Sequence, residues 1–235
     1  MTLLPDAVLR YAAFDEGIID LHLPSRPNGG LLFLVHGGFW REQYDRKHTR
    51  GLARALAELG YLVATPEYRR VDGAGGWPIT AEDVAAAYVA LPGLLAGLGR
   101  AYNRTVTVGH SAGGHLVLWL ASRPLTAPPS RTVALAPVAD LNLARGLDLS
   151  NGAVNAFLSG TPIADADPMS LLDTPPPGAV VLVHGELDRP VPVELSRSFA
   201  AAHPWAELIE LAGLDHFEFL EPDGPAWQAL VDALD

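Results

Sequence analysis

The 235-residue chain contains no cysteine, so disulfide bonds, thiolate metal sites and a cysteine nucleophile are excluded. Basic residues are also few: 16 Lys and Arg stand against 27 Asp and Glu, which gives a formal net charge of −11. No run of Lys or Arg forms a basic stripe. A nucleic-acid partner is therefore not expected.

Two targeting features are also missing. Residues 1–6 lack the basic and apolar segments of a secretion signal. The apolar runs are all interrupted by Gly, Pro or charge before they reach membrane-spanning length. We therefore expect a cytoplasmic location and no membrane partner. A hydrophobic fraction of 49% supports a large core, and the length favours one domain over residues 1–235.

The pattern of apolar residues predicts an N-terminal hairpin followed by alternating strands and helices. The hairpin strands, residues 8–14 and 18–23, flank a DEG turn. Further strands are expected at residues 31–35, 61–65, 105–109, 132–136, 179–183 and 206–211. Helices are expected at residues 46–59, 80–91 with a capping Thr80, 113–121, 193–201 and 225–234. This order predicts an α/β fold with a mostly parallel central sheet and helices on both faces.

Residues 138–177 differ from the rest of the chain. They are rich in Gly, Pro, Asp and Asn, and only two short helices are expected, at 142–147 and 154–158. We interpret this segment as a minimal, lid-like excursion within the single domain. Phe157 would either close over a substrate or anchor the lid to the core.

Residues 105–114, TVTVGHSAGG, contain the most informative motif. A β-branched strand runs into GHSAG at 109–113 and then into a helix, which is the context of a nucleophile elbow. Gly109 and Gly113 have no Cβ and allow the strand and helix to approach closely. The motif predicts that Ser111 is an exposed nucleophile, which requires a base beside it.

A second loop, HGGFW at residues 36–40, leaves the strand at 31–35. Its glycines allow backbone N–H groups to face a ligand, and the N–H of Ala112 would add another donor. Such donors stabilise the oxyanion of acyl transfer. The alternative is a tight loop without a catalytic role.

Two later loops carry an acid and a base. Asp188 follows the strand at 179–183 and is the preferred acid, with Asp140 as its main rival. His216 follows the last strand and is the expected general base, whereas His203 lies at a helix end in a surface setting. The working residues of a parallel sheet lie past the carboxyl ends of its strands, and all three preferred residues fit this rule.

The chain resembles the α/β-hydrolase superfamily over nearly its whole length. HGGFW at 36–40 and GHSAGGH at 109–115 look like the branch that includes kynurenine formamidases and feruloyl-esterase-like (BD-FAE) hydrolases. The resemblance implies a triad of Ser111, Asp188 and His216. It also implies an oxyanion hole from the backbone of Gly38, Phe39 and Ala112, with Gly37 as the alternative donor in the first loop. Too few residues precede position 31 for the N-terminal helical cap of lipase-like relatives, which implies an open site.

Several residues have a weaker assignment. Trp40, Tyr68 and Trp77 are candidates for an aromatic-accepting pocket, and the alternative is packing against the end of the sheet. His110 and His115 would diverge too far to share a metal, and the remaining histidines, among them His48 and His184, need no role. No spacing matches a zinc site, and no cofactor is expected.

These features predict a metal-independent serine hydrolase. It would cleave a small carboxylic ester or an activated amide through an acyl-enzyme. An arylformamidase acting on N-formylkynurenine is an alternative. Further alternatives are an inactive hydrolase fold that only binds a ligand and, last, a peptidase. The sequence leaves the oligomeric state open.

Overall fold

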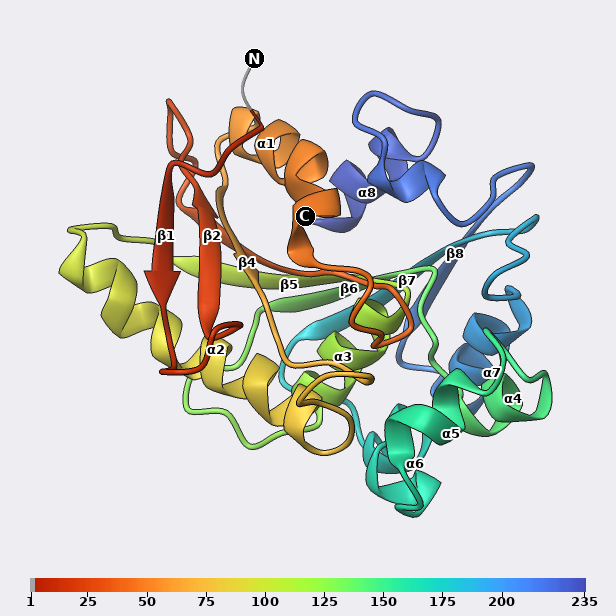
Figure 1. Cartoon of the computed structure of the whole chain (residues 1–235). Helices are drawn as coiled ribbons and strands as arrows, with labels where there is room; N and C mark the ends of the chain where they lie inside the picture. Colours follow the sequence, from red (N-terminus) through yellow and green to blue (C-terminus); the bar gives the residue numbers. More distant parts are fainter. Residues whose placement is uncertain (1–2) are drawn as a thin grey trace.

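The computed structural model describes residues 3–235 and contains one eight-stranded sheet with helices on both faces (Figure 1). The order across the sheet is β1-β2-β4-β3-β5-β6-β7-β8. The β1–β2 and β2–β4 pairs are antiparallel, and the remaining five pairs are parallel. The strands are β1 (Ala7–Arg10), β2 (Ile18–His22), β3 (Gly30–Val35), β4 (Leu62–Pro66), β5 (Arg104–His110), β6 (Arg131–Leu135), β7 (Ala179–Gly185) and β8 (Glu207–Leu211). The predicted α/β architecture with its opening hairpin is confirmed.

The helices form two layers around the sheet. Figure 1 shows α1 and α8 over one face and α2 and α3 over the other, with α4, α5 and α6 grouped at one end. The helices are α1 (Arg50–Glu58), α2 (Ile79–Gly97), α3 (Ala112–Ala121), α4 (Leu141–Gly146), α5 (Ala153–Leu158), α6 (Pro168–Leu171), α7 (Glu194–Ala202) and α8 (Trp227–Ala233). Short 3-10 turns are η1 (Arg46–Thr49), η2 (Ile163–Asp165) and η3 (Glu218–Leu220).

Strand β3 shows why the sheet is buried on both sides. Leu31, Phe33 and Val35 pack into the core beneath α2 and α3, whereas Leu32 and Leu34 pack into the core beneath α1 and α8. A central parallel strand therefore reads as a continuous apolar run, as the sequence predicts. Each such side chain contributes about 2 kcal/mol on burial.

Helix α2 differs from the prediction in two ways. It continues through Pro92 instead of pausing there, because Leu91 before the proline and Leu95 after it are both buried in the core. Packing thus outweighs the missing backbone hydrogen bond. Thr80 does not cap the helix but lies inside it, and its hydroxyl donates to the carbonyl of Arg69 at 2.6 Å.

Helix α2 also corrects the expectation about membrane-spanning segments. By length and composition alone, its 19 residues would be sufficient to cross a membrane. In the fold, however, one side of α2 packs into the core beneath the sheet, and the buried Asp83 pairs with Arg69. A helix that is mostly buried in a protein core has the same length and apolar composition.

The excursion at residues 138–177 contains the two expected helices, α4 and α5, and also η2 and α6, which the sequence analysis did not predict. Aromatic packing and hydrogen bonds fix it to the body of the protein. Phe157 stacks on Trp40 with ring centroids 4.3 Å apart, and its carbonyl accepts from the Trp77 N–H at 2.7 Å. The carbonyl of Ala166 lies 3.0 Å from Nε2 of the buried His115.

Candidate active site

Ser111 lies at the turn between β5 and α3, with φ 58° and ψ −120°. This backbone conformation is strained for a residue with a side chain, and neighbouring strands hold it in place. The Ser111 N–H donates to the carbonyl of Leu135 at 2.8 Å, and the Ser111 carbonyl accepts from Val138 at 3.2 Å. A Cβ at Gly113 would collide with the backbone of Val35, so the turn requires glycine there.

A cavity of about 290 Å³ opens beside this turn. Both Ser111 and His216 line it, although they lie 105 positions apart in the chain. Ser111 is only 2% exposed, which corrects the expectation of an exposed nucleophile, because the surrounding loops enclose the turn within the cavity. Most of its wall is apolar. The full lining consists of Gly38, Phe39, Tyr44, His48, His110, Ser111, Pro190, His216, Phe217 and Leu220.

Asp188 lies directly behind His216, with its Oδ2 2.6 Å from Nδ1 of the imidazole. Its Oδ1 accepts from the N–H of Val191 at 2.8 Å. Burial raises the pKa of Asp188, but the hydrogen bonds from His184 and His216 outweigh that effect and hold it below its ordinary value. An ionised carboxylate only accepts, so Nδ1 of His216 carries the proton and Nε2 is left as the basic atom.

The rival residues lie elsewhere. Asp140 caps α4 by accepting from the N–H of Leu143 at 2.8 Å, and its other oxygen accepts from Ser198 at 2.7 Å. His203 is only 5% exposed, which corrects the expected surface setting, and its ring lies 4.5 Å from that of Phe199. Neither residue lines the cavity.

Two histidines without a predicted role support the site. His184 has Nε2 3.2 Å from Oδ2 of Asp188 and Nδ1 2.7 Å from the Ser196 hydroxyl. His110 has Nε2 2.9 Å from the carbonyl of His216. Burial, and then the nearby His216, lower the pKa of His110 well below its ordinary value. Both histidines lie at the carboxyl ends of strands, which is the one sequence signal that pointed to them.

The loop after β3 forms part of the cavity wall. Gly38 has φ 112° and Phe39 has φ 50°, and both line the cavity. Gly37 is tightly packed, because a Cβ there would lie 2.7 Å from the His110 carbonyl and 2.9 Å from the Ser111 Cβ. Backbone groups of this loop and the start of α3 at Ala112 therefore adjoin the serine.

The aromatic residues that were candidates for the pocket do not line the cavity. Trp40, Tyr68 and Phe157 are completely buried, and Trp77 packs edge-on against Trp119 at 5.6 Å. Tyr68 stacks on His36, whereas Trp40 and Phe157 stack on each other. The structure therefore supports the alternative, in which these four side chains pack inside the protein. Tyr44, His48, Pro190, Phe217 and Leu220 form the wall instead.

The excursion also lies away from the cavity. Within the described residues, no residue of 138–177 belongs to its lining. Phe157 in particular packs beneath Trp40 and does not close over the site. Residues 3–235 contain no group of three or more His, Asp or Glu side chains arranged to hold a metal.

Comparison with known families gives one match. The BD-FAE family model matches residues 19–125. This stretch contains the loop at 36–40 and Ser111 but ends before Asp188 and His216. No curated protein sequence matches the chain.

Several solved structures share the fold at low sequence identity. Esterase B from Lactobacillus rhamnosis is 18% identical, with a TM-score of 0.81 over 98% of this chain and 85% of that one. A truncated carbohydrate esterase from gut microbiota is 16% identical, with a TM-score of 0.79 over 97% and 95%. A thermophilic esterase from Thermogutta terrifontis is 22% identical, with a TM-score of 0.76 over 99% and 93%. These likenesses establish a shared fold.

Proposed function

We propose that this chain, an α/β-hydrolase-fold protein similar to the BD-FAE family, is a serine hydrolase that cleaves a small carboxylic ester. One observation carries the proposal. Ser111 and His216 line the same cavity, and the buried carboxylate of Asp188 lies 2.6 Å behind His216. The three similar structures named above are esterases, which favours an ester over an amide.

The proposed reaction has two steps. Ser111 Oγ attacks the carbonyl carbon while its proton passes to Nε2 of His216, and Asp188 stabilises the resulting imidazolium. The tetrahedral intermediate then collapses, the C–O bond to the alcohol breaks, and the alcohol leaves with the proton from His216. Water repeats the sequence on the acyl-enzyme and releases the acid. Backbone N–H groups from Gly38, Phe39 and Ala112 would hold the oxyanion in both steps.

The cavity favours a small acyl group. At about 290 Å³ it lies at the lower end of the range of small-molecule sites. Phe39, Pro190 and Leu220 give it an apolar wall, which suits a short alkyl chain better than a charged one. Esterase B has been captured with a C4-C4 tributyrin phosphonate and the Thermogutta esterase with propionate, so the chains in both ligands are short.

An arylformamide is the second candidate substrate. A formyl group needs less room than any other acyl group, and the rings of Phe39, Tyr44 and Phe217 would receive an aromatic amine. This candidate does not depend on Trp40, which is buried. Rates on N-formylkynurenine, feruloyl esters, and acetyl and butyryl esters of p-nitrophenol, measured side by side, separate the two.

The serine mechanism is tested with Ser111→Ala. We expect its turnover of p-nitrophenyl acetate to fall to background, and a fluorophosphonate to label the wild type but not the variant. Wild-type protein that stays unlabelled would instead point to an inactive fold that only binds a ligand. Activity should survive EDTA, because no proposed step uses a metal ion.

A further inference from the structure

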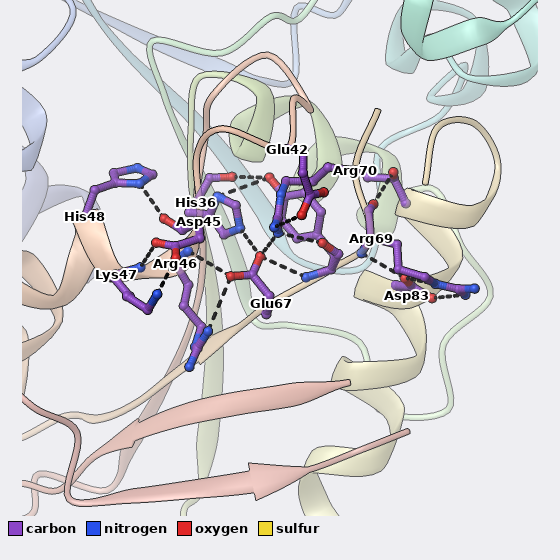
Figure 2. Close-up of polar contacts among 12 residues, drawn as sticks. His36, Glu42, Asp45, Arg46, Lys47, His48, Glu67, Arg69, Arg70 and Asp83 are labelled. Atoms are coloured by element: carbon purple, nitrogen blue, oxygen red, sulfur yellow. Dashed lines mark hydrogen bonds and ion pairs between the residues drawn. The ribbon is translucent and has the colours of Figure 1, made fainter. Parts of the chain in front are cut away.

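Glu67 is a buried carboxylate at the base of the loop at residues 36–40 (Figure 2). Its Oε1 lies 2.9 Å from Nε2 of His36 and accepts from the N–H of Tyr68 at 3.2 Å. Its Oε2 accepts from the N–H of Arg46 at 3.1 Å. Burial raises the pKa of Glu67, but His36, Arg70 and Arg46 outweigh it and lower the pKa to about 2. Glu67 also forms ion pairs with Arg46 and Arg70, so it is ionised and only accepts hydrogen bonds.

The other nitrogen of His36 also faces an acceptor. Nδ1 lies 2.9 Å from the carbonyl oxygen of Gly37. The Tyr68 hydroxyl is 3.4 Å from the same nitrogen, but its proton is donated to the His36 carbonyl at 2.8 Å. Because a carbonyl and an ionised carboxylate cannot supply a proton, each ring nitrogen of His36 must carry its own.

His184 shows the contrasting case. Its Nε2 faces acceptors on Val191 and Asp188, but its Nδ1 faces the hydroxyl of Ser196, which can donate. A neutral imidazole satisfies all of these partners. Of these two histidines, only His36 has an accepting partner on both ring nitrogens.

We propose that His36 is an imidazolium ion held by Glu67, and that it polarises the Gly37–Gly38 peptide of the oxyanion hole. The peptide is planar and trans, so its C=O and N–H point in opposite directions. A charged donor on the Gly37 carbonyl strengthens the Gly38 N–H as a donor, because hydrogen bonds in series polarise one another. Gly38 lines the cavity beside Ser111. His36 is thus a positioning residue, and its catalytic consequence rests on the proposed function.

The charges around His36 are compatible with this state. Arg46, which also contacts Glu67, has Nε 2.8 Å from the buried Asp20. Arg70, the other cation on Glu67, also has Nη2 3.1 Å from Oε1 of Glu42. Each arginine is therefore shared with a second carboxylate.

Two aromatic rings complete these surroundings. The ring of Tyr68 stacks on the imidazole of His36 at 4.3 Å. His48 lies edge-on at 5.6 Å, and burial, the largest cause, lowers its pKa. The neighbouring imidazole is therefore neutral and does not oppose a charge on His36.

The protonation state is measured directly on the full-length wild type. Two-bond ¹H–¹⁵N spectra of imidazole rings distinguish a doubly protonated ring from either neutral tautomer, and ring-to-backbone correlations assign His36. We expect both nitrogens of His36 to be protonated at pH 7.5. A ring with one unprotonated nitrogen at that pH overturns the proposal.

A pair of variants then tests the origin of the charge. Glu67→Gln removes the counter-ion, so we expect His36 to lose one proton. We expect kcat to fall about tenfold with KM little changed, which is less than the 10²–10³ that removal of a whole oxyanion donor costs. Asp83→Asn is the matched control, because Asp83 is also buried and paired with an arginine but has no contact with His36 (Figure 2). It should leave His36 doubly protonated.

The outcomes separate this inference from the proposed function. If His36 keeps both protons in Glu67→Gln, Glu67 does not hold the charge and the inference fails. If Ser111→Ala keeps its activity, the serine mechanism fails, whereas the protonation of His36 is still read from its spectrum. Equal losses of kcat in Glu67→Gln and Asp83→Asn would indicate a general structural effect and overturn the link to the oxyanion hole.

Discussion

The imidazole of His184 lies against the carboxylate of Asp188, with Nε2 3.2 Å from Oδ2. The same oxygen accepts the 2.6 Å hydrogen bond from His216. Asp188 thus carries two imidazoles, one from the strand that precedes it and one from the far end of the chain. Ser196 on α7 selects the tautomer of His184 by donating to Nδ1 at 2.7 Å.

Ser196→Ala should therefore weaken the site from a distance. Without the hydroxyl, His184 loses the partner that keeps its Nε2 proton facing Asp188, and a buried acceptor is left unsatisfied. We expect kcat to fall severalfold and the free energy of unfolding to fall by about 1 kcal/mol. Ser198→Ala on the same helix is the control, since Ser198 bonds to Asp140 and not to Asp188. Equal kcat values for the two variants would contradict the tautomer argument.

Asp188→Asn should be far more damaging. An amide nitrogen facing Nδ1 favours the tautomer whose Nε2 is protonated, and that tautomer cannot accept the proton of Ser111. We expect kcat to fall by about 10⁴ with little change in KM, as for the equivalent change in a Ser-His-Asp protease. Asp140→Asn tests the acid that the geometry rejects, and its kcat should stay near that of the wild type. Steady-state kinetics on p-nitrophenyl acetate measure both.

The sequence predicts the positions of the strands, the elbow and the loops of the site because these depend on local rules. Strands end where their apolar runs end, and GHSAG requires a tight turn at Ser111. The direction in which an aromatic side chain of a loop points depends instead on residues far away in the sequence. Phe39 and Trp40 are adjacent and both have positive φ, yet Phe39 lines the cavity while Trp40 is buried against Phe157.

The supporting residues escaped prediction for the same reason. The contact between His184 and Ser196 joins β7 to α7, and that between Glu67 and His36 joins the ends of two neighbouring strands. Neither pair has a sequence spacing that marks it. The contact between Glu67 and His36 requires the carboxyl ends of β4 and β3 to lie at one edge of the sheet, and that between His184 and Ser196 requires α7 to pack beside β7.

Gly37 beside Ser111 and Gly93 in α2 should respond differently to substitution by alanine. Gly37→Ala places a Cβ 2.7 Å from the His110 carbonyl and 2.9 Å from the Ser111 Cβ, so the loop or the nucleophile must shift. Because a misplacement of about 1 Å can cost 10²-fold, we expect kcat to fall by about that factor. Gly93→Ala, in α2 with no atom within 4 Å of the added Cβ, should leave kcat unchanged and stabilise the protein by about 1 kcal/mol. Kinetics and urea unfolding of the two variants test this contrast.

The lowered pKa of Glu67 predicts that part of the free energy of unfolding depends on pH. Its pKa is lowered from the ordinary 4.5 to about 2 in the folded protein. A lowered folded pKa means that the carboxylate stabilises the fold fully above about pH 4.5 and that this contribution is lost as the pH falls toward about 2. Since one pKa unit corresponds to 1.36 kcal/mol, the contribution at neutral pH is on the order of 3 kcal/mol.

Urea unfolding of the wild type and of Glu67→Gln between pH 2.5 and pH 7 measures this share. The glutamine cannot titrate, so we expect the wild type to be more stable by on the order of 3 kcal/mol at pH 7 and the difference to shrink steadily below about pH 4.5. Asp83→Asn shows whether any buried acid produces the same curve. A difference between wild type and Glu67→Gln that stays constant across the range would mean that Glu67 contributes through packing alone, and that its charge is not what holds the loop at residues 36–40.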